Sequence, residues 1–463
     1  MQDTRTSQPT VAHGPWRTEL AATMRLAWPL ALANLLQMLV YAVDVIFIAR
    51  LGDAPLAASS LAVSIFGIVM WCFFGMTGMV AALISAQLGR RAHSVREIRR
   101  STRMALWLSV ILGVIGMVIC LGGEWFMVLT GQDPEIIALS ASYMNVVIWA
   151  MIPLLLAGTL RSFVSAMGRP IMATFITALA IGVNALANYA FVFGNLGMPE
   201  LGLPGAGFAT IITGIVQALA YLVAIWSDKR LRRYHILGNF WRPEWFALKE
   251  LVRTGSPVAL TILAEGGLFS IAAFMMGRFG ATQLAGHTIA LQVAALAFQI
   301  PFGVGQAATI RVGYFFGAGN REGMARAGWV AIVVGTGFMA VTASIMLFAP
   351  RAVLSIYVDV DAARNTAMVA FALQYLIIAA MFQLVDGMQA VAAGSLRGLQ
   401  DTRVPMWFAI FSFWVPGFGI ALLLGFGTSL EGVGVWIGLA AGLLFTAILM
   451  VWRWSRREQL GLT

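Results

Sequence analysis

Long apolar runs, separated by short polar or charged breaks, dominate this chain. Twelve of them are long enough to predict helices that cross a membrane, because roughly 20 apolar residues span the hydrocarbon core. A membrane β-barrel would instead alternate apolar and polar positions. The pattern predicts an all-α integral membrane protein with spans near residues 25–49, 56–86, 104–122, 137–159, 170–193, 206–226, 251–277, 284–310, 327–349, 366–390, 404–425 and 433–452.

Composition supports the membrane class. Of the 463 residues, 60% are hydrophobic and only 11% are charged, whereas a soluble domain carries about 25% charged residues. The first twenty residues are polar and lack an apolar core, so we expect no cleaved signal peptide. Only short loops remain between the spans, which leaves no room for a separate soluble domain.

The distribution of basic residues predicts the orientation. If the N-terminus lies inside, 26 of the 30 Lys and Arg residues fall on the cytoplasmic side, as the positive-inside rule requires. We therefore expect a multi-pass protein of the inner membrane with both termini in the cytoplasm. The net charge of +10 then reflects topology and attraction to anionic membrane lipid, and we expect no nucleic-acid partner.

An internal repeat divides the chain into two halves. One constant offset in residue number superposes Arg25 and Pro29 on Arg253 and Pro257, and Gly89 on Gly317. Six spans per half is an even number, so both halves share one topology and their pseudo-twofold axis runs along the membrane normal. The predicted segments are an N-terminal tail (1–24), an N-lobe (25–227), a cytoplasmic linker (228–250), a C-lobe (251–453) and a C-terminal tail (454–463).

Three acidic residues fall well inside the predicted spans: Asp44, Glu265 and Asp386. Carboxylates at membrane depth are costly and normally face a bundle interior or a wet cavity, so they are functional candidates. No basic residue is predicted at comparable depth. Acid-only charge favours a positively charged cargo, namely small organic cations.

Polar side chains also recur at helical spacing inside the spans. Such groups either complete the oxygen coordination of a cation, contact the substrate, or form hydrogen bonds between helices. For cation or proton coupling we select Asn184 and Asn188, four residues apart. For substrate contact we select Gln37, Tyr41, Gln292, Gln299 and Gln383.

Motifs of soluble catalysis are missing from the sequence. There is no Walker A motif for ATP and no His/Glu zinc arrangement. An intramembrane enzyme using Glu265 or Asp386 as acid and base is one alternative, but catalysis does not require two-lobed symmetry. A flippase for a lipid-linked precursor is another, but an anionic headgroup would favour a basic cleft. We expect a transporter that is not an enzyme and needs no cofactor.

Several stretches together resemble the multidrug and toxic compound extrusion (MATE) transporters, in the NorM-like branch. The resemblance covers essentially the whole chain after the N-terminal tail. It rests on "VDVIFIARLG", "LRSFVSAMGRP", "NALANYAFVFG", "GLPGAGFAT", "GYFFGAGN" and "GSLRGLQDTRVP", in this order along the twelve spans.

The resemblance implies two six-helix lobes in a V and export of cationic amphipathic drugs by alternating access, in antiport with Na⁺ or H⁺. It implies that an acid of span one works with two asparagines of span five and a threonine of span six. It also implies further acids in spans seven and ten, and Phe382 stands where that family often has a tyrosine. The residues in these places are Asp44, Asn184, Asn188, Thr210, Glu265 and Asp386, with Na⁺ expected at Asp44, Asn184 and Asn188 or at Glu265 and Asp386. We expect the protein to function as a monomer.

Overall fold

The computed structural model describes residues 16–91 and 94–463 of the chain. The first 15 residues of the predicted N-terminal tail therefore lie outside the described part. Across the described ranges the regular secondary structure is helical, and twelve helical segments are long and apolar enough to cross a membrane. This confirms the predicted all-α class and the number of spans.

The first half of the chain forms the N-lobe. Several of its spans are divided into two consecutive helices. The helices are α1 (Trp16–Ala49), α2 (Asp53–Gly78), α3 (Val80–Arg90), α4 (Ser94–Leu121), α5 (Gly123–Leu129), α6 (Pro134–Val147), α7 (Met151–Ala166), α8 (Pro170–Phe193) and α9 (Leu203–Ser227).

The second half forms the C-lobe after the short linker helix α10 (Lys229–Arg232). A π-helical turn at Phe413–Gly417, which contains Pro416, joins two parts of its fifth span. The helices are α11 (Trp245–Arg278), α12 (Ala281–Gly317), α13 (Arg321–Phe348), α14 (Pro350–Leu354), α15 (Thr366–Gly398), α16 (Arg403–Ser412), α17 (Phe418–Gly427) and α18 (Gly432–Ser455).

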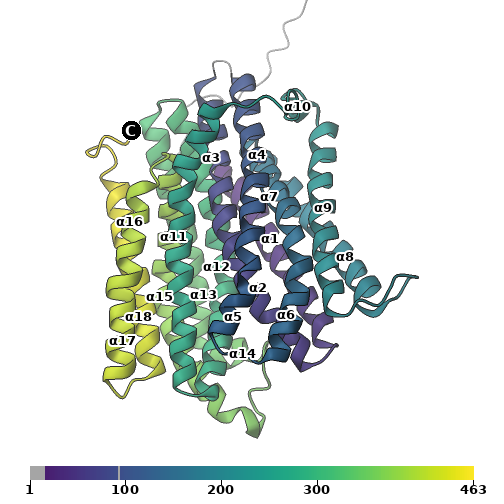
Figure 1. Cartoon of the computed structure of the whole chain (residues 1–463). Helices are drawn as coiled ribbons and strands as arrows, with labels where there is room; N and C mark the ends of the chain where they lie inside the picture. The colour runs from purple at the N-terminus through teal and green to yellow at the C-terminus, as the bar shows by residue number, and fades with distance from the viewer. Residues whose placement is uncertain (1–15, 92–93) are drawn as a thin grey trace, which may run out of the picture.

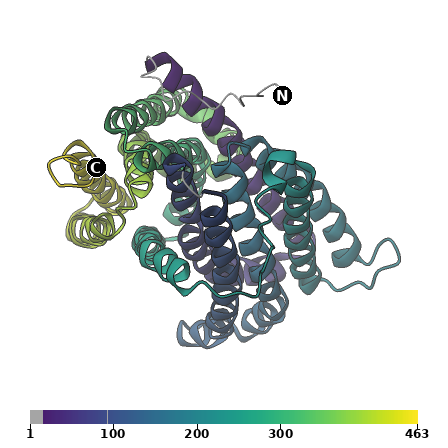
Figure 2. The same cartoon turned by 90° about the horizontal axis from the view of Figure 1, so that it is seen from above.

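Two lobes are visible when the molecule is seen along its helices. In Figure 2 the blue and teal helices of the first half lie on one side, and the green and yellow helices of the second half lie on the other. One buried apolar cluster fills the N-lobe, and it also takes in Leu251, Val258 and Ile310 from the C-lobe. Further apolar clusters lie wholly within the C-lobe, so each lobe has a core of its own and the two share a packed contact.

The contact between the lobes has pseudo-twofold symmetry. A methyl group on Gly317 would overlap the carbonyl oxygen of Ala86, and one on Gly89 would overlap that of Tyr314. The offset of the internal repeat converts positions 86 and 89 into 314 and 317, so these are two copies of one contact, as a twofold interface requires. The internal repeat therefore predicted the pseudo-twofold symmetry correctly. Gly89 and Gly317 have no side chain, so the backbones of α3 and α12 can approach each other closely where they cross.

The lobes are also joined by polar contacts near the end of the bundle where α10 lies (Figure 1). Arg311 of α12 donates two hydrogen bonds to Glu19 of α1, at 2.9 Å and 2.6 Å. Deeper along the same pair of helices, the Asn34 amide donates to Gln306 at 3.3 Å. In this structure the lobes are closed against each other at this end.

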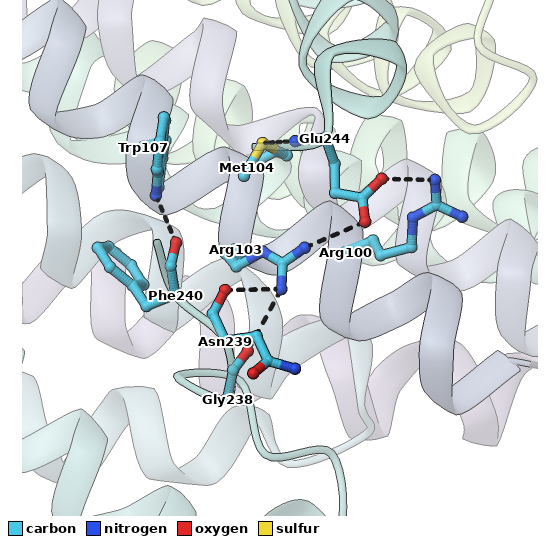
Figure 3. Close-up of polar contacts among 8 residues, drawn as sticks. All are labelled: Arg100, Arg103, Met104, Trp107, Gly238, Asn239, Phe240 and Glu244. Carbon is cyan, nitrogen blue, oxygen red and sulfur yellow. Dashed lines mark hydrogen bonds and ion pairs between the residues drawn. The ribbon is translucent and has the colours of Figure 1, made fainter. Parts of the chain in front are cut away.

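The linker after α10 is fastened to the N-lobe, as Figure 3 shows. Arg103 of α4 donates hydrogen bonds to the carbonyl oxygens of Gly238 and Asn239, at 3.3 Å and 3.1 Å. Glu244, directly before α11, forms ion pairs with Arg100 at 2.8 Å and with Arg103 at 3.4 Å. The linker is therefore attached to the N-lobe as far as Glu244, and the C-lobe begins with α11 directly after it.

Replacing Glu244 by Gln should loosen this attachment. The two arginines lose their shared counter-ion, and a partly exposed ion pair of this kind contributes up to about 1 kcal/mol. Hydrogen exchange of the amides of residues 234–244 should accelerate about fivefold, the equivalent of that free energy. Glu250→Gln, the same change within α11, is the control and should leave exchange in 234–244 unaltered. Equal exchange in Glu244→Gln and wild type would contradict the attachment.

Candidate functional site

Asp44 lies inside the N-lobe and is surrounded by the residues expected around it. Its Oδ1 accepts hydrogen bonds from the side-chain amides of Asn184 at 2.9 Å and Asn188 at 2.7 Å, and its Oδ2 accepts one from the Thr210 hydroxyl at 3.4 Å. All four residues are buried, and Asp44 is 8% exposed. Helix α1 packs against the consecutive helices α8 and α9, which are distant from it in sequence, and the three helices bring four predicted residues into one cluster.

Helical geometry explains how α8 presents two amides to one carboxylate. Residues four apart lie on the same helix face, and the Asn188 amide also donates to the Asn184 backbone and side-chain oxygens, at 3.0 Å and 3.1 Å. The Oδ1 of Asn188 is buried and has no hydrogen-bond partner among the described residues. An unpartnered oxygen beside a carboxylate suits a hard cation, because such ions prefer oxygen ligands.

A second layer of polar groups extends the cluster. Gln217 of α9 donates to Gln37 at 3.4 Å, and Gln37 lies one helical turn from Tyr41 in α1. Tyr143 of α6 is buried and lies near Thr210. The sequence pattern selected Gln37 and Tyr41 but not Tyr143. In the sequence Tyr143 is recognisable only as a hydroxyl group within an apolar run. It could not be selected from that, because nothing in the sequence shows which face of α6 meets α9.

The C-lobe holds the other two acids. Asp386 of α15 is 7% exposed, and its Oδ1 has no hydrogen-bond partner among the described residues. The Asp386 carboxylate lies close enough to Glu265 of α11 for the two to interact electrostatically. Glu265 also lies near Arg397 and Gln389. The C-lobe therefore contains two carboxylates near one guanidinium, whereas the cluster around Asp44 is bonded by neutral groups.

Two basic side chains also lie within the long helices. Arg161 lies within α7, where it donates to the backbone oxygen of Leu30 at 3.5 Å and to the side chain of Asn34. Arg397 lies within α15 beside Glu265. Both helices extend beyond the predicted spans, which ended at 159 and 390, because a helix can continue past the apolar run that reveals it. The three acids still lie well inside the predicted spans, whereas these two arginines lie beyond the ends of theirs.

The glutamines predicted to contact substrate do not come together. Gln292 of α12 is exposed, and Gln299 is buried with its amide bonded to Ala295 of its own helix at 3.2 Å. Gln383 of α15 accepts a hydrogen bond from Thr342 of α13 at 2.8 Å. The contact made by Gln383 joins two helices of one lobe, which was the alternative role left open for these residues.

The MatE family model matches two segments of the chain, residues 29–190 and 257–423. The two matches begin at Pro29 and Pro257, which the internal repeat superposes on each other. The family model therefore supports the repeat independently.

Relatives of known name match over nearly the whole length. The chain is 42% identical over 450 residues to "Probable multidrug resistance protein NorM" of Brucella suis, covering 97% of this chain and 96% of that protein. It is 40% identical to the protein of the same name from Mesorhizobium japonicum, covering 96% of each. The crystal structure of the eukaryotic MATE transporter AtDTX14 has the same fold, with a TM-score of 0.85, 17% identity, and 97% and 100% coverage. The two-lobed fold, its repeat and these relatives agree, and the chain belongs to the MatE family.

Proposed function

We propose that this protein is a secondary active multidrug efflux transporter that exports cationic amphipathic compounds in antiport with Na⁺ or H⁺. The observation that carries this proposal is the environment of Asp44. Every hydrogen bond that reaches its carboxylate within residues 16–91 and 94–463 comes from a neutral amide or hydroxyl. A buried carboxylate without a positive partner is costly, so it favours binding of a mobile cation or proton.

Relatives support the choice of cargo. Those that match over nearly the full length are named multidrug resistance proteins, and three acidic side chains lie well inside the predicted spans here. A cation with aromatic rings pairs its charge with these acids while its apolar part contacts the lobes. We propose Glu265 and Asp386 as a second place for such a charge, or for the coupling ion.

Alternating access supplies the mechanism. The lobes touch at the end marked by Glu19, Arg311 and the crossing of Gly89 and Gly317, which the basic residues indicate is cytoplasmic. Rocking of the lobes would separate these contacts and close the opposite end. Coupling requires that ion and drug bind the two states unequally, and a carboxylate exposed in one state and occluded in the other provides that inequality. We place the protein in the inner membrane as a monomer with both termini in the cytoplasm.

Efflux from proteoliposomes tests this proposal and identifies the ion. A Na⁺ gradient and a pH gradient are imposed separately on liposomes that contain the purified protein. One of the two should drive efflux of a fluorescent organic cation, chemically unchanged, and the gradient that does so identifies the coupling ion. Protein-free liposomes and an ionophore that collapses the gradient are the controls. Dye movement that is independent of both gradients, or faster transport of anionic dyes than of cationic ones, would reject the proposal.

A further inference from the structure

A cavity of about 430 Å³ opens where α9 meets the linker, at the end of the bundle that carries α10 (Figure 1). Its walls come from the last turn of α9 and from the linker. They combine apolar side chains with one guanidinium and one imidazole, from Ile225, Trp226, Arg232, His235, Ile236, Leu237 and Gly238. None of these residues belongs to the cluster around Asp44, so the cavity is separate from the site described above.

The linker wall of this cavity is held in a fixed shape. Tyr234 and Ile236 are buried against the N-lobe, at 1% and 2% exposure. Arg99 of α4 donates to the Tyr234 carbonyl at 2.7 Å, and Arg103 holds the Gly238 carbonyl in the same way (Figure 3). His235, between the two buried residues, has a φ of 42° and lines the cavity. The site is therefore part of the packed N-lobe.

The charge at the cavity mouth is positive. Arg232 lines the cavity, and Lys229 and Arg230 precede it in α10. The nearby acids are already engaged, since Asp228 pairs with Arg169 at 3.1 Å and Glu244 pairs with the arginines of α4. A guanidinium beside an imidazole is a good ligand for a phosphate group, because both donate hydrogen bonds to anionic oxygens.

An apolar track leads to the cavity along α9. Leu219, Val223 and Trp226 lie on one face of the helix and are each more than half exposed. In a membrane-spanning helix such a face contacts lipid chains, and tryptophan is typical of the level of the headgroups. A ligand that uses the whole site therefore has a phosphate at one end and an acyl chain at the other.

We propose that this cavity is a specific site for an anionic glycerophospholipid of the leaflet on the α10 side. The phosphate binds Arg232 and His235, and an acyl chain lies along Trp226 and Val223. A free phosphate would leave the apolar track unused, which is why the site is assigned to a lipid. The proposal does not depend on the direction or cargo of transport.

Native mass spectrometry of the detergent-purified full chain, titrated with phosphatidylglycerol or phosphatidylcholine, tests this site. One phosphatidylglycerol should bind more tightly than phosphatidylcholine. Arg232→Gln should weaken that first binding event about fivefold, the usual effect of one basic side chain on an anionic lipid. Trp226→Ala, on the other wall, should also weaken it. Thermal melting of each variant checks that it is folded. We expect wild-type melting temperatures, because the replaced side chains are exposed.

Arg230→Gln is the matched control, because Arg230 is exposed and basic but does not line the cavity. It should alter binding of the first phosphatidylglycerol less than twofold. Equal weakening by Arg230→Gln and Arg232→Gln would show general attraction to the basic linker and would overturn the site. Displacement of phosphatidylglycerol by millimolar glycerol phosphate would overturn the assignment to a lipid, because that competitor has the phosphate without the chain.

Discussion

Asp44→Asn is expected to abolish gradient-driven efflux while leaving the protein folded. The asparagine side chain keeps an oxygen that can accept the hydrogen bonds now given by Asn184 and Asn188, and its new amide can donate to the Thr210 hydroxyl. What disappears is the charge that a cation or proton neutralises. Without this charge, ion occupancy no longer distinguishes the two lobe arrangements. Uphill transport should therefore fall at least tenfold, since coupling between two binding sites typically changes affinity by about 5-fold to 150-fold.

The measurement is dye efflux from proteoliposomes under the effective ion gradient, with a melting temperature recorded for each variant. Asp133→Asn is a matched control, because Asp133 caps α6 on the exposed surface and asparagine caps a helix equally well. Asp386→Asn and Glu265→Gln show whether the C-lobe also takes part. If Asp44 were only structural, the amide would remove the cost of burying a charge, raise the melting temperature and leave efflux intact. That result would remove Asp44 from the mechanism.

A disulfide across the pseudo-twofold axis should stop transport reversibly. Ser85 and Gly313 are repeat equivalents, and a Cβ built on Gly313 lies 3.2 Å from the Cβ of Ser85. The Cβ atoms of a disulfide are about 3.5–4.5 Å apart, so a small shift allows Ser85→Cys and Gly313→Cys to bond. Oxidation would hold the lobes together at this end, and efflux should fall to the level of protein-free liposomes. A reducing agent should restore it.

The control pair lies within one lobe. The hydroxyls of Ser109 and Thr159 are 2.7 Å apart in the N-lobe, so Ser109→Cys with Thr159→Cys should cross-link without joining the lobes and should leave efflux unchanged. Both pairs are placed in a background with Cys72 and Cys120 replaced by Ala, since these thiols are free. Full efflux from protein whose Ser85–Gly313 pair is completely cross-linked would show that the lobes need not separate here.

Much of the architecture followed from the sequence because the membrane makes local composition decisive. Every backbone polar group of a helix in hydrocarbon must be bonded within that helix, so each apolar run predicts one span without knowledge of its neighbours. The constant offset between the two halves predicted the lobes and their axis, and the contacts of Gly89 and Gly317 follow that axis. The sequence pattern also selected Asp44, Asn184 and Asn188, and the resemblance added Thr210, the third residue that bonds Asp44.

What the sequence left open depends on which helix faces which. The ends of α7 and α15 are set by packing, so Arg161 and Arg397 were assigned to loops although they lie within helices. The periodic glutamines were equivalent in sequence, yet Gln383 joins α13 to α15 and Gln292 is exposed. The partners of Tyr143 and of Arg103 come from other helices or from the linker, far away along the chain. A helical period fixes which residues share a face, but only the packed tertiary structure decides what that face meets.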